Sequence, residues 1–282
     1  MRQWRTLGAV SPEDLVGPRA ELHHAVQLLA SFGQTLLDPR PDDSHRSMVW
    51  SAPDAGFSTS AMGQEPNLRV TVAPTDLKAT LHGETGVLAS RSLVGLTLDD
   101  AYAWLESELA GALGRDGLRL GRPEYEIPPR GTAKGAPLGG APEAALVELE
   151  AWFENAAGVL DGLASQDDNA TPVRCWPHHF DIATLFVLDP ELGPEEGRSV
   201  GVGFSPGDVA TPQPYWYVTP YPDPGTYDLP ELPGGYWNTE GWFGAVLPGS
   251  AVVAAGSAAE QESLTGAFLR EAISAGRVVL GG

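Results

Sequence analysis

Apolar and polar residues alternate with the period of a helix at four places along the chain. Apolar side chains recur every three or four residues after Pro18 and again after Pro142, the spacing of one face of an amphipathic helix. Thr97-x-x-Asp100 has the pattern of a capping box, which marks a helix N-terminus, and a similar box begins at Ser257. The pattern predicts helices at about 18–37, 98–113, 142–164 and 258–275.

Shorter runs between these helices have the composition of strands. Short strands flanked by helices, without a regular βαβ alternation, favour an α+β fold with antiparallel sheets and helices on one face. The predicted strands lie at about 45–51, 56–62, 68–73, 77–82, 87–94, 173–188, 199–204 and 242–247.

The same markers recur in the same order, which predicts an internal duplication with two similar halves about a pseudo-twofold axis. Ala73-Pro-Thr-Asp76 returns 132 residues later as Ser205-Pro-Gly-Asp208, and the capping box returns after 160 residues. The growing offset places about 28 extra residues in the second half. We expect a first repeat at 1–120, a Pro- and Gly-rich linker at 121–142, and a second repeat at 143–282 with an insertion at about 209–241.

Charge narrows the range of partners. The net charge is −20 overall and −16 over residues 143–282, and no Lys or Arg lies between Arg198 and Arg270. Nucleic acids and anionic membranes require clustered cations, so neither is expected as a partner, and a neutral or cationic ligand fits better. No phosphate-binding or dinucleotide-binding motif occurs, and no cofactor is predicted. The chain has a single cysteine, Cys175, and its first residues include no apolar run of signal-peptide length. Both features predict a cytoplasmic protein.

The predicted insertion is rich in aromatic residues. Nine aromatics fall between Tyr215 and Phe243, interleaved with prolines and acids. Ring faces beside carboxylates suit the capture of organic cations, although rings that complete the core would leave the same pattern. The residues expected to contact a ligand are Trp176, Tyr215, Tyr217, Trp237 and Trp242, with polar groups from His179, Asp181 and Glu240.

The predicted strand 173–188 carries most of the histidine and carboxylate chemistry. If it is continuous, His179 and Asp181 share one face and His178 the other. A His–Asp pair can act as a general base or hold a metal, but no metal is predicted, because a site would need a third ligand, for which His45 is the symmetry-related candidate. We expect Cys175 to be a buried thiol. His23 and His24 are expected at the edge of the first main helix.

Three segments together resemble an uncharacterised family of bacterial cytoplasmic α+β proteins. They are Trp-Pro-x-x-Phe-Asp (176–181), Gly-Phe-x-Pro-Gly-Asp (203–208) and a Tyr- and Pro-rich stretch (215–224). The first half has a similar layout, so the resemblance covers most of the chain. It brings no activity with it. It implies that His178 and His179 are not a general requirement, since members often carry small residues there.

These observations leave three hypotheses. The leading one is a small-molecule-binding protein with an aromatic and acidic cleft between the halves. The sequence does not decide whether such a protein would be an enzyme. The second is a non-catalytic interaction protein that uses the aromatic segment to form a homodimer or to bind a partner. The third is a metal-dependent hydrolase built on His178, His179 and Asp181.

Overall fold

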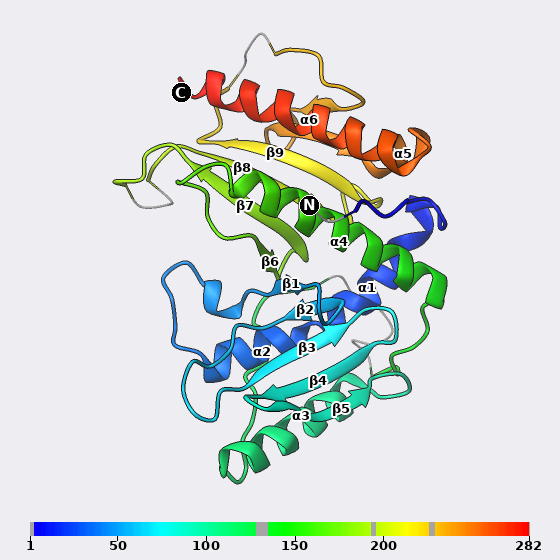
Figure 1. Ribbon diagram of the computed structural model, residues 1–282, viewed down its shortest axis with the longest axis vertical. Coiled ribbons are helices and arrows are strands. Elements are labelled where there is room, and N and C mark those ends of the chain that lie inside the picture. The colour runs from blue at the N-terminus through cyan, green and yellow to red at the C-terminus, as the bar shows by residue number, and fades with distance from the viewer. Residues whose placement is uncertain (1–2, 128–134, 193–195, 226–228, 282) are drawn as a thin grey trace. The chain divides into compact units, whose positions relative to one another are not determined.

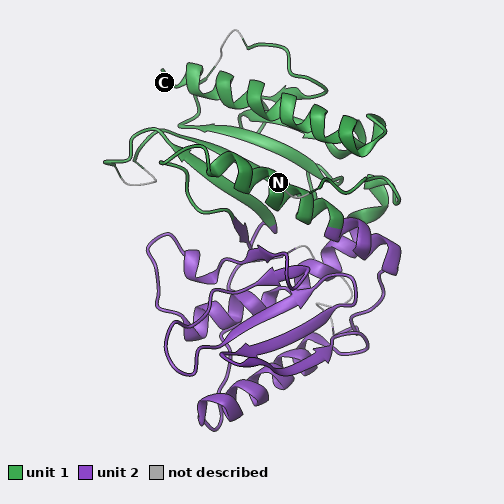
Figure 2. Ribbon diagram, viewed as in Figure 1, with its two compact units in different colours: residues 1–15, 151–173, 181–282 green, residues 16–150, 174–180 purple. Residues whose placement is uncertain are grey.

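A computed structural model describes residues 3–127, 135–192, 196–225 and 229–281. Its chain divides into two compact units (Figure 2). Unit 1 comprises residues 1–15, 151–173 and 181–282, and unit 2 comprises residues 16–150 and 174–180. These units differ from the predicted halves in three segments. The first fifteen residues belong with the second half, 174–180 belong with the first, and unit 2 also includes the predicted linker and residues 143–150.

The fold is α+β with two antiparallel sheets, as the pattern of short strands predicts (Figure 1). One sheet has five strands in the order β1-β2-β3-β4-β5, and the other has six in the order β10-β11-β9-β8-β7-β6. Duplication and a pseudo-twofold axis stay predictions.

Unit 2 is a meander of five strands with helices before and after it. A 3-10 turn, η2, lies between α2 and β1. Each of the five strands pairs with the strand that follows it in the sequence. The capping box is present at α3: the Thr97 side chain accepts from the Asp100 N–H, and the Asp100 side chain accepts in return. Its elements are α1 (Val16–Ala25), α2 (Gln27–Leu36), η2 (Ser44–Arg46), β1 (Val49–Ser51), β2 (Gly56–Ser58), β3 (Arg69–Ala73), β4 (Lys78–Gly83), β5 (Gly86–Ser92), α3 (Leu98–Leu113) and β6 (Arg174–Trp176).

Unit 1 contains the second capping box, at Ser257 and Glu260, which begins its last helix. The helix α4 (Glu143–Ala164) starts in unit 2 and continues into unit 1 from residue 151. The core of unit 1 includes Trp152 stacked on Phe204, with ring centroids 5.4 Å apart. The other elements are η1 (Pro12–Leu15), β7 (Asp181–Val187), β8 (Ser199–Ser205), β9 (Tyr215–Tyr221), β10 (Tyr236–Asn238), β11 (Gly244–Pro248), α5 (Gly249–Ala254) and α6 (Ala258–Val279).

The predicted strand 173–188 is wrong as a single element. Between β6 and β7 the chain makes a turn in which Phe180 has a φ of 58°, a left-handed conformation that interrupts a strand. The buried Phe180 ring stacks on His23 at 5.0 Å and packs against Phe57 at 5.4 Å, and these contacts hold the turn. The face assignment of His178 and His179, which assumed a continuous strand, is therefore wrong as well.

The predicted insertion is not a separate cover over a finished sheet. Its strand β9 lies between β8 and β11, and Trp216 on that strand is fully buried. The aromatic segment therefore supplies a central strand of the sheet.

Candidate functional site

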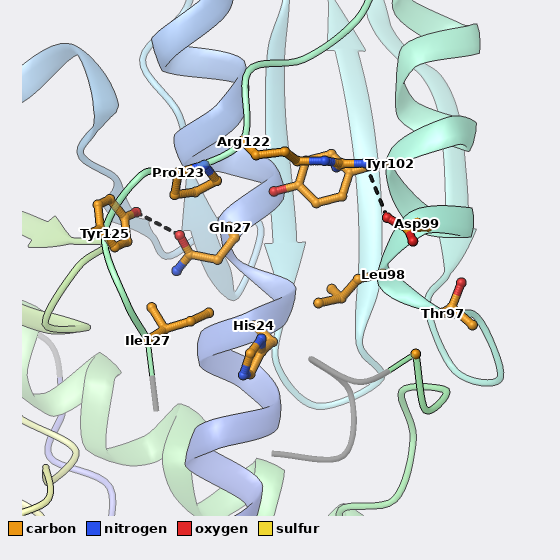
Figure 3. A pocket seen from close by; sticks show the side chains of 11 residues that line it. His24, Gln27, Thr97, Leu98, Asp99, Tyr102, Arg122, Pro123, Tyr125 and Ile127 are labelled. Atoms are coloured by element: carbon orange, nitrogen blue, oxygen red, sulfur yellow. Dashed lines mark hydrogen bonds and ion pairs between the residues drawn. The ribbon is translucent and has the colours of Figure 1, made fainter. Parts of the chain in front are cut away.

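A cavity of about 240 Å³ opens on the helical side of unit 2 (Figure 3). Four separate stretches of chain form it: the α1–α2 region, the N-terminal turn of α3, residues 122–127, and Gly135. The lining residues are His24, Gln27, Thr97, Leu98, Asp99, Tyr102, Arg122, Pro123, Tyr125, Ile127 and Gly135.

Gln27 and Tyr125 form the fixed polar wall of the cavity. The Tyr125 hydroxyl donates to Gln27 Oε1 at 2.6 Å, as Figure 3 shows. The Gln27 amide nitrogen donates to the carbonyl oxygens of His23 and Pro177, each at 3.0 Å. Burial raises the pKa of Tyr125 above its ordinary range, so the phenol stays protonated at neutral pH. Its oxygen still has lone pairs that can accept a hydrogen bond.

Arg122 and Asp99 form the rim. The Arg122 guanidinium lies 3.2 Å from the centroid of the Tyr102 ring, and its Nη2 is 3.4 Å from Asp99 Oδ1. A 2.9 Å hydrogen bond between the Tyr102 hydroxyl and Ser31 Oγ holds the Tyr102 ring in place. Burial raises the pKa of Tyr102 as well. The rim therefore carries one positive and one negative charge that face each other.

The segment predicted to be an interdomain linker, 121–142, is anchored to unit 2 on both sides of the residues left out of the description. Upstream of the cavity, Gly121 N–H donates to Thr35 Oγ1 at 2.9 Å. Downstream, the buried Glu21 carboxylate accepts from three consecutive backbone N–H groups, those of Gly139, Gly140 and Ala141. This anchoring is why a segment with little apolar content forms part of a wall.

His23 and His24 are buried, and the prediction that they sit at a helix edge is wrong. His23 Nε2 lies 2.8 Å from the Pro177 carbonyl oxygen, and its ring stacks on Phe180. Burial lowers the pKa of His23 to about 4, so the imidazole is neutral and donates this bond. The two helix positions that carry these histidines face other segments of unit 2 rather than water.

Several residues predicted to contact a ligand lie together on the sheet of unit 1. The Tyr217 hydroxyl donates to the Asp181 carboxylate in a short hydrogen bond. Tyr215 donates to Asp208 Oδ2 at 2.6 Å, and the rings of the two tyrosines are 6.2 Å apart. Asp208 Oδ1 also accepts from the Thr211 N–H at 2.7 Å.

The other predicted ligand contacts of unit 1 lie around β10. Trp237 stacks on Phe243 at 5.6 Å and donates through Nε1 to the Pro230 carbonyl at 2.9 Å. Trp242 is 38% exposed, and the carbonyl of the neighbouring Glu240 accepts from Asn238 at 3.1 Å. A second cavity in unit 1, of about 180 Å³, is lined by none of the predicted residues, but by Gln3, Trp4, Glu154, Asn155, Gly158, Val159, Gly162, Leu163, Gln166 and Glu262.

Trp176, His178 and His179 belong to unit 2 and form a short row of rings. The centroid separations are 6.2 Å from Trp176 to His178 and 4.4 Å from His178 to His179. His45 is buried elsewhere in unit 2 and accepts from the Arg40 N–H through Nδ1 at 3.2 Å. Among the described residues, no three or more His, Cys, Asp and Glu side chains come together as a group that could hold a metal ion.

The sequence did not predict the cavity, since its lining comes from stretches that are far apart along the chain. The available signal was Gln27, a polar residue whose neighbours in the sequence, Val26 and Leu28, are apolar. Comparison of the chain with protein-family models, with curated proteins and with solved structures finds no significant similarity. Within the described ranges, every helix is too short or too polar to cross a membrane.

Proposed function

We propose that the protein binds a neutral, ring-containing small molecule in the cavity of unit 2. The observation that carries the proposal is the cavity of about 240 Å³ walled by two tyrosines, an amide and an imidazole. Concave sites lined by apolar and aromatic surface with a few fixed polar groups are the usual form of a small-molecule site. Leu98, Pro123 and Ile127 supply the apolar part of the lining.

The charges on the rim favour a neutral ligand. Arg122 and Asp99 are both at the opening, 3.4 Å apart, so a ligand of either charge meets one like charge. A neutral molecule avoids both repulsions.

The polar wall favours a ligand that donates a hydrogen bond. The amide nitrogen of Gln27 is engaged by two carbonyl oxygens, and the Tyr125 proton is engaged by Gln27. The Tyr125 oxygen is left as an acceptor aimed at the cavity. An N–H or O–H group on the ligand would donate a hydrogen bond to the Tyr125 oxygen.

Filling the cavity tests the location. We would screen small ring compounds by ligand-observed NMR and use indole as the working probe. Ile127→Trp places a large side chain into the lining and is expected to abolish indole binding. Leu163→Trp is the matched control, since it fills the cavity of unit 1 instead. Equal indole binding by both variants, or no binding by the wild type, would count against the proposal.

Removing the hydrogen bond tests the chemistry. Indole donates an N–H and 1-methylindole does not, so indole should bind more tightly. A net hydrogen bond contributes about 0.5–1.5 kcal/mol, so Tyr125→Phe is expected to weaken indole about two- to tenfold and leave 1-methylindole unchanged. If 1-methylindole binds as tightly as indole, the predicted donor role is wrong.

The ligand site predicted from the aromatic segment, in a cleft between the halves, stays a prediction, as does a cytoplasmic location. We also propose that the two α+β segments arose by duplication, supported by the run of antiparallel strands followed by a helix with a capping box in each unit. The metal-dependent hydrolase receives no support, because the described residues contain no group of ligands for a metal.

A further inference from the structure

One face of the unit 1 sheet is covered by helices (Figure 1). Phe204 on β8 stacks on Trp152 of α4. Val200 on the same strand lies next to α6, since a Cβ added at Gly276 would be 3.3 Å from Val200 Cγ1. Residues four apart on a strand point to the same face, so α4 and α6 share it. The opposite face carries the alternate residues of each strand.

Aromatic side chains gather on that opposite face. Tyr217 on β9 lies opposite Gly203 on β8 and opposite Val246 on β11, and Val246 lies opposite Tyr236 on β10. Directly opposed residues share a face, so one row across the sheet carries two tyrosines. Tyr236 is 47% exposed.

Glycines on this face let rings lie against the sheet. A Cβ at Gly203 would come within 2.4 Å of the Tyr217 ring, and a Cβ at Gly244 would come within 2.4 Å of the Trp242 ring. Each ring therefore occupies the space beside its glycine that a larger side chain would fill. The carboxylate of Asp181, which accepts from the Tyr217 hydroxyl, fixes that ring in place.

The surrounding charge is negative. Residues 143–282 carry a net charge of −16, and the 71 residues between Arg198 and Arg270 include no Lys or Arg. Where the described chain places a cation over a ring, the ring lies elsewhere: Arg122 lies over Tyr102 in unit 2, and Arg277 lies over Phe186, which is opposite Val200 on the helix-covered face of unit 1. The negative face of an aromatic ring attracts a cation, most strongly for Trp, and a negative surface raises the local concentration of cations.

We propose that this aromatic face of unit 1 binds a small organic ammonium ion, with Trp242, Tyr236 and Tyr217 as the contact rings. The site lies in the other unit from the cavity of the proposed function and takes a ligand of different charge. The backbones of β9 and β10 are two strand spacings apart, about 10 Å. One quaternary ammonium group can therefore approach rings from both strands within the roughly 6 Å that the interaction requires.

Choline and its uncharged isostere, 3,3-dimethyl-1-butanol, separate charge from shape. We would titrate each into the wild-type protein and follow the indole N–H resonances by NMR. Choline should shift the Trp242 resonance, and the shift should weaken with added NaCl because salt screens exposed charges. The neutral isostere should leave the resonance in place. Equal binding of the two compounds, or no binding of choline, would overturn the proposal.

Variants locate the site. An exposed cation–π contact contributes about 0.5–1 kcal/mol, so Trp242→Leu and Tyr236→Leu should each weaken choline about two- to fivefold. Both side chains are exposed, so folding is expected to survive, and thermal melts check this. Trp104→Leu, on α3 in unit 2, is the matched control and should leave choline binding unchanged. Undiminished binding by both ring variants would overturn the assignment. So would a wild-type dimer in sedimentation that Trp242→Leu disperses, since a second copy would then occupy the face.

Discussion

Lowering the pH should destabilise unit 2 through one buried imidazole, that of His23. Burial lowers its pKa from an ordinary 6.5 to about 4. The folded state therefore resists protonation that the unfolded chain accepts, so the stabilisation is complete above pH 6.5 and is lost as the pH falls toward 4. The difference between the two pKa values corresponds to about 3 kcal/mol, of which about 2.5 kcal/mol is lost by pH 4.5.

The cause of this effect is specific to where the ring lies. Protonation would place a charge on a side chain that is 5% exposed and stacked on Phe180. The Pro177 carbonyl favours the charged form, but it offsets only part of the desolvation. His23 should therefore be among the groups that determine how the unit responds to acid.

Urea unfolding at pH 7 and pH 4.5 measures the effect. His23→Gln keeps a neutral donor at the position and cannot titrate, so its free energy of unfolding should fall by about 2.5 kcal/mol less than that of the wild type over this range. If His23→Gln and the wild type lose stability in parallel, the ring is not the titrating group and the reasoning is wrong.

Three further changes test contacts away from this ring. Glu21→Gln should lower the free energy of unfolding by about 2 kcal/mol, since its carboxylate accepts three backbone N–H groups; a variant as stable as the wild type in urea would contradict this. Gly203→Ala should cost about 1–3 kcal/mol, because the new methyl group displaces the Tyr217 ring, and a thermal melt without a lower midpoint would show that the ring does not lie over Gly203. The buried Cys175 should react with a thiol reagent only as fast as the protein opens, so immediate labelling of the folded protein would show that it is accessible.

Local patterns predicted three of the four helices closely, whereas the predicted helix 18–37 is divided at Val26 into α1 and α2. The α3 helix runs over the predicted 98–113, and α4 begins one residue after the predicted start at 142. Both capping boxes are formed by residues three apart, so the signal and the structure it causes lie within one turn. Antiparallel strands joined by short turns were also recognisable, because their alternation is local.

Features that depend on distant residues could not be predicted in this way. The turn at Phe180 is held by rings from α1 and β2, more than a hundred residues earlier. The central position of β9 depends on pairing with β8 and β11 rather than on its own composition. An aromatic- and proline-rich stretch has the composition of a loop when its pairing partners are unknown, which is why the sequence predicts an insertion at about 209–241 rather than a central strand.

The polar residues of the first helices explain why the cavity of unit 2 exists. Glu21, His23 and Gln27 occupy buried positions where an apolar side chain would be the simpler choice, and burying a polar group without a partner costs free energy. Each forms hydrogen bonds with backbone groups far away in the sequence. Glu21 accepts from N–H groups of residues 139–141, and His23 and Gln27 donate to the carbonyl oxygen of Pro177. These bonds can form only after the remote segments have been brought to the helix. Residues 139–141 are thereby bound to the helix at the end of the segment that contributes to the cavity wall. The cavity remains because polar contacts, rather than packed apolar side chains, hold this segment in place.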